Sequence, residues 1–369
     1  SSIQGVQPMV SGPVAGQVGF SAVGATNAYH GAFNAARTRG SKFFPETVFQ
    51  ADALCRLSEA HAQAATAATY CAWYDATGVM NFPKGNNNNA LKDINDLAVT
   101  FTSAGASGAP NMALTGSGSN FAKTTHNGQA CGISDVNGNI FKINPGMTSI
   151  ATAKAITGAT QASPVVLTVT GHGIATGTQV YVSGVAGMTQ LNTRIFKATV
   201  VDADRISLDG VDGTGFAAYT SGGSVTVGVF YALKPSADIA TIGDGATLAT
   251  DHWGTAGAAA LFDVVNMEFA TTYPNNSAGQ RYGNGASAVF DMSTANGRAL
   301  VMLGMPAAGG VSPSGTNAMG LDYFEQYIVN QLCVISRGYW TNGSLAGVRS
   351  RYLDSNRTTA GYVGFAASC

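Results

Sequence analysis

The sequence predicts an α+β domain that is interrupted by a small all-β domain. Composition changes sharply near Thr148 and again near Val227, and between these points short β-rich runs alternate with turn residues. Outside this segment a helical pattern begins just after Phe44. We therefore divide the chain into an N-terminal arm, residues 1–27, an outer domain, residues 28–147 plus 228–369, and an inserted β-domain, residues 148–227.

The outer domain has one clear helical segment, which we expect at about residues 45–66. Pro45 lies in its first turn, and Ala53, Leu57, Ala60 and Ala64 form an apolar stripe at helical spacing. Two weaker helical stretches cover residues 255–266 and 321–331, although the β-branched and aromatic residues of the second would equally suit a strand.

The insert reads as a series of short strands. Helix signals are nearly absent there, and Asp-Gly and Gly-rich steps separate the apolar runs. The expected strands are Val165–Thr170, Gln179–Ser183, Ile195–Val201, Arg205–Leu208 and Ser224–Val227. Five or six such strands predict a small barrel or sandwich, which suits a projecting or spacing module.

The composition favours a subunit of an assembly. Charged residues make up 11% of the chain, less than half the typical ~25%. Isolated soluble domains usually rely on a charged surface, so a chain this poor in charge suits burial against neighbours. We expect the partners to be copies of the chain itself, in a homo-oligomer, and other proteins of the same assembly.

Charge also excludes two classes of partner. The 19 basic and 20 acidic side chains give a net charge of -1, which provides no electrostatic footprint for nucleic acid or an anionic membrane. No stretch approaches ~18 uninterrupted apolar residues, and the segment Ser1 to Val10 lacks the features of a secretory signal. We expect no nucleic-acid binding, no membrane insertion and no export.

Two outer segments carry a family pattern. The first is Gly132-Ile133-Ser134-Asp135-Val136-Asn137-Gly138-Asn139-Ile140-Phe141, and the second is Arg337-Gly338-Tyr339-Trp340 followed by Gly364-Phe365. They resemble the C-type-lectin-like fold of the formylglycine-generating enzyme superfamily, in which GVxDxxGNVWEW, RGGSW and GFR occur in this order. Tyr339 and Ala366 depart from that pattern, so the resemblance implies the fold skeleton alone.

Further resemblances point to a virus particle. Residues 336–367 resemble the variable C-terminal region of lectin-fold proteins that retroelements diversify in phages and bacteria. The insert, with Gly184-Val185-Ala186-Gly187 and Leu208-Asp209-Gly210, is similar to a β-module of bacteriophage virion proteins that is described by its likeness to a domain of ubiquitin-activating enzymes. Together they imply a protein of a tailed-phage virion.

The residues for enzyme chemistry are not evident. Oxidising members of the superfamily use a close pair of thiols, whereas Cys55 and Cys71 lie sixteen positions apart. Iron-dependent members need clustered histidines, whereas no two of the five histidines, His30, His61, His126, His172 and His252, fall within one helical turn. We predict no catalytic residues, no cofactor and no metal site, and keep an oxidoreductase of the formylglycine-generating type as a minor alternative.

A ligand-binding surface is expected in the closing segment. Aromatic side chains offer large contact areas at low entropic cost, and Arg and Asn supply directional hydrogen bonds. The candidate residues are Tyr339, Trp340, Asn342, Arg349, Arg351, Tyr352, Asn356, Arg357 and Tyr362. The alternative is that the aromatic residues fill the core, while the arginines solvate a face or contact a neighbouring subunit.

The leading expectation is a non-enzymatic structural protein of fibre, collar or decoration type. It would be made in the host cytoplasm, lie on the exterior of the phage particle and adhere to carbohydrate or protein of the host surface. The alternative is a purely architectural collar or capsid-decoration subunit, held by subunit contacts and by an intermolecular disulfide through Cys369. Five reduced thiols are the alternative to that disulfide.

Overall fold

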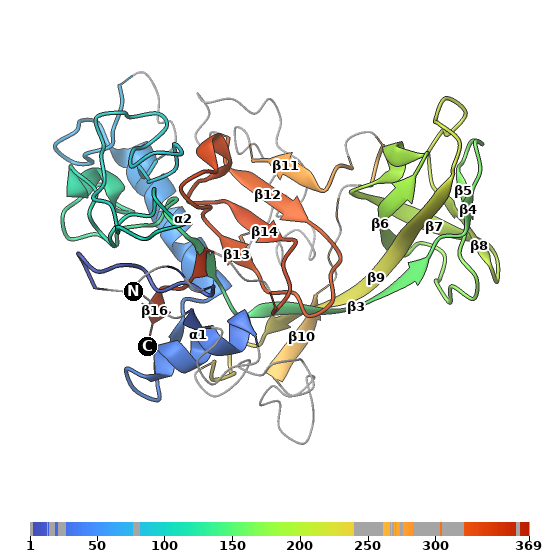
Figure 1. The fold of residues 1–369 in the computed structure, drawn as a ribbon, viewed down its shortest axis with the longest axis horizontal. Coiled ribbons are helices and arrows are strands. Elements are labelled where there is room, and N and C mark those ends of the chain that lie inside the picture. The colour runs from blue at the N-terminus through green and yellow to red at the C-terminus, as the bar shows by residue number, and fades with distance from the viewer. Residues whose placement is uncertain are drawn as a thin grey trace.

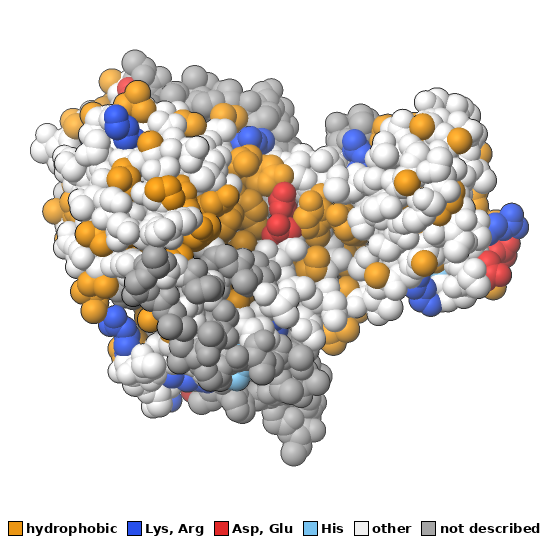
Figure 2. Space-filling model, in the orientation of Figure 1, with side chains coloured by type: hydrophobic (Ala, Val, Ile, Leu, Met, Phe, Trp, Pro, Cys, Tyr) orange, Lys and Arg blue, Asp and Glu red, His pale blue; other side chains and the backbone are white. Residues whose placement is uncertain are grey.

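The chain has two lobes that are joined by long strands (Figure 1). The computed structural model describes residues 3–12, 14, 19–20, 27–76, 82–239, 261–265, 267, 269, 271–273, 276–282, 303–304, 321–358 and 362–368. The larger lobe holds the two described α-helices and both ends of the chain, which lie near each other, and the smaller lobe is built of strands (Figure 1). Figure 2 shows the molecule in the orientation of Figure 1, and few charged side chains lie on this face, in agreement with the low charge of the sequence.

The regular elements of the described residues are two α-helices, sixteen strands and three short 3₁₀ helices. The α-helices are α1 (Ala28–Arg37) and α2 (Val48–Ala64), and the 3₁₀ helices are η2 (Phe121–Thr124), η3 (Thr189–Leu191) and η4 (Gly343–Leu345). The strands are β1 (Phe44–Pro45), β2 (Phe141–Ile143), β3 (Met147–Ala155), β4 (Gly158–Ala159), β5 (Val166–Thr168), β6 (Gln179–Ala186), β7 (Arg194–Asp202), β8 (Arg205–Leu208), β9 (Ser221–Leu233), β10 (Phe262–Val265), β11 (Gly279–Arg281), β12 (Tyr323–Gln326), β13 (Ile335–Ser336), β14 (Arg351–Leu353), β15 (Val363–Gly364) and β16 (Ala367–Ser368).

The predicted α+β, C-type-lectin-like fold is wrong. Sheets dominate the described residues: an eight-stranded sheet, a six-stranded sheet of mixed direction and the pair β1 and β16. Two segments with helical patterns, around Phe262 and Tyr323, form the strands β10 and β12. Short amphipathic runs suit either element, and here the pairing with neighbouring strands decides.

The predicted first helix is confirmed as α2, but its buried face is not the predicted one. The Thr47 hydroxyl accepts a hydrogen bond from the Gln50 amide at 3.2 Å, and the Gln50 side chain accepts one from the Thr47 amide at 2.8 Å, a capping box that fixes the start. The predicted stripe is exposed, with Leu57 47% accessible. The buried face instead carries Asp52 and Cys55, because polar groups of the sheet lie opposite it.

The six-stranded sheet has two different faces. Its order is β11-β12-β14-β13-β2-β15, and successive residues of each strand point to opposite sides. Arg351 of β14 points toward α2, where its guanidinium donates to the Cys55 sulfur at 3.3 Å. On the other face Ile143 and Ile335 pack against residues of α1. Helix α1 does not cover the rest of this second face, and the candidate site lies on the uncovered part.

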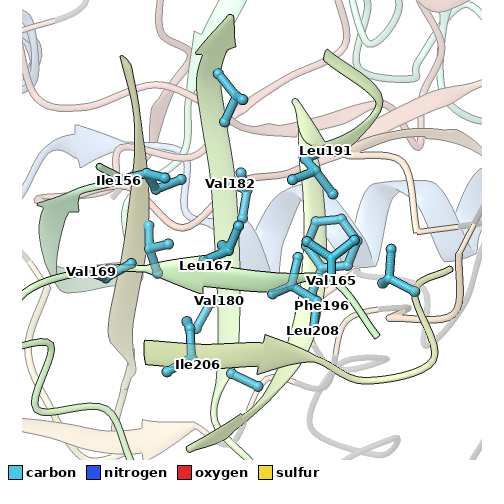
Figure 3. Close-up of a cluster of buried hydrophobic side chains, with 14 of the residues drawn as sticks. Ile156, Val165, Leu167, Val169, Val180, Val182, Leu191, Phe196, Ile206 and Leu208 are labelled. Carbon is cyan, nitrogen blue, oxygen red and sulfur yellow. The ribbon is translucent and has the colours of Figure 1, made fainter. Parts of the chain in front are cut away.

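The smaller lobe is a β-module with its own core. Sixteen buried side chains from Ile156 to Val225 form one cluster between its strands, and ten of them are labelled in Figure 3. Strands and one 3₁₀ helix are the regular elements between β3 and β9, so the prediction of short strands there is confirmed. β3 pairs with β9 over its whole length, from Met147 opposite Ala232 to Ala155 opposite Ser224, and this ribbon runs into the larger lobe (Figure 1).

The described parts of the N-terminal arm pack against the same chain. Val10 and Phe20 are fully buried, and the Ser11 amide donates to the Val363 carbonyl at 2.7 Å. Phe20 meets Phe365 edge-on at 5.6 Å between ring centroids. These parts of the arm thus close the edge of the six-stranded sheet at β15.

Candidate functional site

An aromatic pocket lies on the open part of the six-stranded sheet. Its volume is about 450 Å³. The lining residues come from five of the sheet's strands, from the loops that follow β13 and β14, and from η4, and we call this site the aromatic pocket. They are Phe141, Tyr323, Glu325, Ile335, Tyr339, Asn342, Leu345, Tyr352, Asp354, Ser355, Tyr362 and Val363.

A continuous wall of rings runs across the sheet. The Phe141 ring lies 5.0 Å from both the Tyr339 and the Tyr352 ring, measured between centroids. Tyr323 continues the row at 5.6 Å from Tyr352. Phe141, Tyr352 and Tyr323 lie on β2, β14 and β12 of one sheet, and Tyr339 lies in the loop that follows β13, between β2 and β14 in the sheet order.

The Trp340 ring packs against the rings of Tyr339 and Tyr362. It is buried, and its ring lies 5.2 Å from Tyr339 and 4.4 Å from Tyr362. Tyr339 and Tyr362 are nearly parallel, with an interplanar angle of 15° and centroids 6.3 Å apart. The Tyr362 hydroxyl donates to the Gly108 carbonyl, which ties the ring to a distant loop. Tyr339 and Tyr362 are half-buried and present accessible ring surface to a ligand.

Hydrogen bonds fix the loops of the rim. The Asn342 side-chain oxygen accepts from the Tyr339 amide at 2.7 Å, and the Asn342 amide donates to the Tyr339 carbonyl at 3.1 Å. The Tyr352 hydroxyl donates to the Leu345 carbonyl at 3.1 Å. The rings are therefore held in place before any ligand arrives.

Two carboxyl groups lie beside the aromatic wall. Glu325 is in the middle of β12, Asp354 directly follows β14, and the parallel pairing of Glu325 with Tyr352 brings them to one face. Tyr323 donates to the Glu325 carboxyl at 2.9 Å, and Ser355 donates to the Asp354 carboxyl at 3.0 Å. Figure 2 shows an acidic patch among hydrophobic side chains over β12 and β14.

Asp354 lies close enough to Glu325 for its charge to act on the Glu325 carboxyl. Burial, and next the negative charge of Asp354, raise the pKa of Glu325 to about 7. At neutral pH Glu325 is therefore divided between its protonated and its ionised form.

Five of the nine predicted site residues belong to this region. Tyr339, Asn342, Tyr352 and Tyr362 line the aromatic pocket, and Trp340 lies behind two of them. Tyr352 is itself buried, so it contributes mostly to the floor. The aromatic part of the predicted surface thus gathers in one place.

The predicted arginines do not reach the pocket. Arg349, Arg351 and Arg357 are buried, and none of them lines the aromatic pocket. Arg349 bonds to Glu59 of α2, and the Arg357 guanidinium carbon lies 4.2 Å from the Tyr29 ring centroid of α1. Each bonds or stacks on a group of the two helices, so their role as ligand contacts stays a prediction that this placement does not favour.

Asn356 also lies outside the pocket. It is exposed, and its side chain accepts a hydrogen bond from the Thr358 amide at 3.0 Å, as a turn residue does. Cys369 lies outside the described residues. The described cysteines, Cys55, Cys71, Cys131 and Cys333, form no disulfide with one another.

Sequence reasoning missed Phe141, Tyr323, Glu325, Asp354 and Ser355. The alternation Tyr323-Phe324-Glu325-Gln326-Tyr327 carries the signal, because a strand places Tyr, Glu and Tyr on one face. Under a helical interpretation of the same segment Glu325 would point away from the face that Tyr323 and Tyr327 share.

In the described part of the chain, no group of three or more His, Cys, Asp or Glu is arranged to hold a metal ion. Neither α-helix there combines the length and the hydropathy that crossing a membrane requires.

Residues 162–227 match the family of the ubiquitin-activating enzyme E1 FCCH domain. The matched segment contains β5 to β8 and the first part of β9. The likeness of the insert to a domain of ubiquitin-activating enzymes is therefore confirmed, whereas the aromatic pocket lies outside the matched residues. No curated protein matches the chain.

Proposed function

We propose that this chain is a non-enzymatic structural protein on the exterior of a tailed-phage particle and that its aromatic pocket binds carbohydrate or protein of the host surface. The observation that carries the proposal is the pocket itself, in which accessible rings and polar groups lie on a rigid sheet. Preformed concave sites with aromatic walls and a few polar groups are typical of ligand binding.

The β-module and the composition support the location. The insert is similar to a module of phage virion proteins, and it forms a separate lobe at one end of the molecule (Figure 1). A chain with 11% charged residues suits incorporation into an assembly, where much of its surface is covered.

The described cysteine thiols argue against an oxidoreductase role. Burial raises the pKa of Cys71 to about 11, which leaves a poor nucleophile at neutral pH. Burial also raises the pKa of Cys55, whose thiol donates to the Val348 carbonyl at 2.6 Å.

A purely architectural role is the second candidate, and one surface favours it. Strands β9 and β10 border a groove of about 850 Å³ in which Val229 and Val264 are 45% and 67% exposed. Ile150 of the adjacent β3 is also exposed. Exposed apolar side chains beside the edge strand β10 suit a contact between subunits.

Immunogold electron microscopy of the parent particles tests the location and separates the two candidates. Antibody is raised against residues 162–227, and the control is antibody absorbed with the purified chain. Gold on fibres or at the tail tip supports the adhesion role. Gold around the neck or over the head favours the architectural role, and unlabelled particles that also lack the chain by mass spectrometry would refute a place in the virion.

A further inference from the structure

We propose that the aromatic pocket binds an alkylammonium group, the cationic end of a choline-type or lysine-type ligand. This inference rests on the proposed binding role of the pocket and names the chemistry of its ligand. It follows from three features of the pocket: its rings, the absence of a cationic side chain from its lining, and its carboxyl pair.

The rings supply the first half of a cation site. Five of the twelve lining residues are Phe or Tyr. A ring face attracts an ammonium group through its quadrupole, most strongly where water is excluded. Methyl or methylene groups on the nitrogen pack against the same ring surfaces.

No lysine, arginine or histidine is among the residues that line the pocket. Arg281 of β11, the strand next to β12, lies beside the wall. Its guanidinium carbon is 5.4 Å from the Tyr323 ring centroid, and it donates to the carbonyl of Ser344 at 2.8 Å and to that of Leu321. Arg281 is thus held by backbone acceptors and is not among the residues that line the pocket.

The carboxyl pair supplies the second half. Glu325 and Asp354 each accept a hydrogen bond from a neighbouring hydroxyl, and at neutral pH the Glu325 carboxyl holds a proton in part of the molecules. An ammonium group that enters between the rings replaces that proton as the positive partner. The pair then carries two negative charges against the ligand's one positive charge, with the two hydroxyl donors still in place.

The other titratable groups around the pair stay neutral at physiological pH. They are the phenols of Tyr181 on β6, Tyr323 and Tyr327 on β12 and Tyr352 on β14, and burial raises the pKa of each of these tyrosines. Of these groups, Glu325 is therefore the one whose charge changes between pH 6 and 8.

Binding of a cation should release a proton. The protonated pair must ionise to hold the ligand, so affinity rises with pH through the pKa of about 7. One displaced proton with that pKa makes binding about tenfold tighter at pH 8 than at pH 6. A neutral sugar needs no second negative charge and gives no such rise.

In the experiment, choline and n-butylammonium are each titrated into the full chain at pH 6, 7 and 8, and calorimetry measures the heat of binding. Both probes keep their charge over this range. Their neutral controls are 3,3-dimethylbutan-1-ol, in which carbon replaces the choline nitrogen, and butan-1-ol. Comparing the affinities for choline and for butylammonium shows whether the pocket prefers a quaternary or a primary ammonium group.

The expected result is saturable binding of at least one cation, about tenfold or more tighter than its neutral control and tighter again at pH 8. Glu325→Gln should weaken binding and abolish the pH dependence. Asp263→Asn, an exposed carboxylate of β10 outside the pocket, should change neither. The circular dichroism of each variant verifies its fold.

Equal binding of cations and neutral controls, or cation binding that ignores pH and Glu325→Gln, would overturn the inference. Binding of methyl glycosides but not of cations would also overturn it, while leaving the adhesive role of the pocket in place. Particles whose attachment does not depend on the pocket would instead contradict the proposed function.

Discussion

Arg337 donates a 2.6 Å hydrogen bond to Glu46, and both side chains are buried. Glu46 immediately precedes the N-cap of α2, and Arg337 follows β13, so this pair joins segments that are 291 positions apart. Asn144 adds a 2.9 Å hydrogen bond to the Glu46 carbonyl. A buried ionic network thus connects α2 to the sheet that carries the aromatic pocket.

Arg337→Met should destabilise the chain by about 3–5 kcal/mol, because it leaves the Glu46 carboxylate buried without its partner. Replacing both residues, as Glu46→Leu with Arg337→Met, should cost less than Arg337→Met alone. Urea denaturation measures all variants. Lys42→Met removes an exposed ion pair with Asp238 and should stay within about 0.5 kcal/mol of the parent chain. An Arg337→Met chain as stable as Lys42→Met would contradict this role.

Lys142 of β2 makes stability depend on pH. It lines a second cavity, of about 350 Å³, and burial lowers its pKa to about 8. Between that value and its usual 10.5 the unfolded chain holds a proton that the folded chain has lost, so stability rises with pH. Relative to Lys142→Met, the parent chain should gain roughly 2–3 kcal/mol between pH 7 and pH 10. If the free energies of unfolding of the parent chain and of Lys142→Met differ by the same amount at pH 7 and at pH 10, the pKa of Lys142 is not lowered.

Arg351 and Tyr339 should respond differently to truncation. Arg351→Ala removes donors to the Val348 and Ser350 carbonyls and to Cys55, and should destabilise by about 2–5 kcal/mol. Tyr339→Ala removes a half-buried ring and should lower stability by less than about 2 kcal/mol. Thermal melts of both variants give the comparison. A stable Arg351→Ala chain with impaired ligand binding would return Arg351 to the site.

Gly347 leaves room for a buried carboxylate. A methyl group there would lie 1.8 Å from Asp322, which accepts a hydrogen bond from the Arg349 amide at 2.9 Å. Gly347→Ala should therefore cost more than about 2 kcal/mol. Gly215→Ala, in the β-module where a methyl group meets open space, is the control. Equal melting temperatures for the two variants would mean that the Asp322 loop moves aside freely.

Local signals in the sequence were enough for some elements. Pro45 and the residues after it predict α2, and turn residues such as Gly210 separate the strands of the β-module. Gly210 has a φ of +72°, which glycine adopts without strain. These features depend on neighbours in the chain, so pattern reasoning reaches them.

The faces of the elements could not be predicted in the same way. Leu57 lies on the apolar stripe of α2 yet is exposed, whereas Asp52 is buried because Arg349 lies 3.7 Å from its carboxylate. Arg349, Arg351 and Arg357 have the composition of a binding surface. Only the packing of distant helices against their segment turns them inward.

The pocket itself was half predictable. Tyr339 and Tyr362 are in or close to the second motif, whereas Tyr323 reaches the same pocket through the pairing of β12 with β14. Phe141 ends the first motif, but only the pairing of β2 with its neighbours brings it to the pocket. Glu325 could be placed there only once β12 was known to be a strand beside β14.

Attachment of particles that carry pocket variants tests the central claim most directly. Tyr339→Ala combined with Tyr362→Ala removes the accessible rings, and Asn356→Ala changes an exposed residue outside the pocket. The account predicts that the double variant assembles but attaches to host cells about tenfold less or worse, while Asn356→Ala attaches normally. Assembled double-variant particles that attach as well as the parent would contradict it.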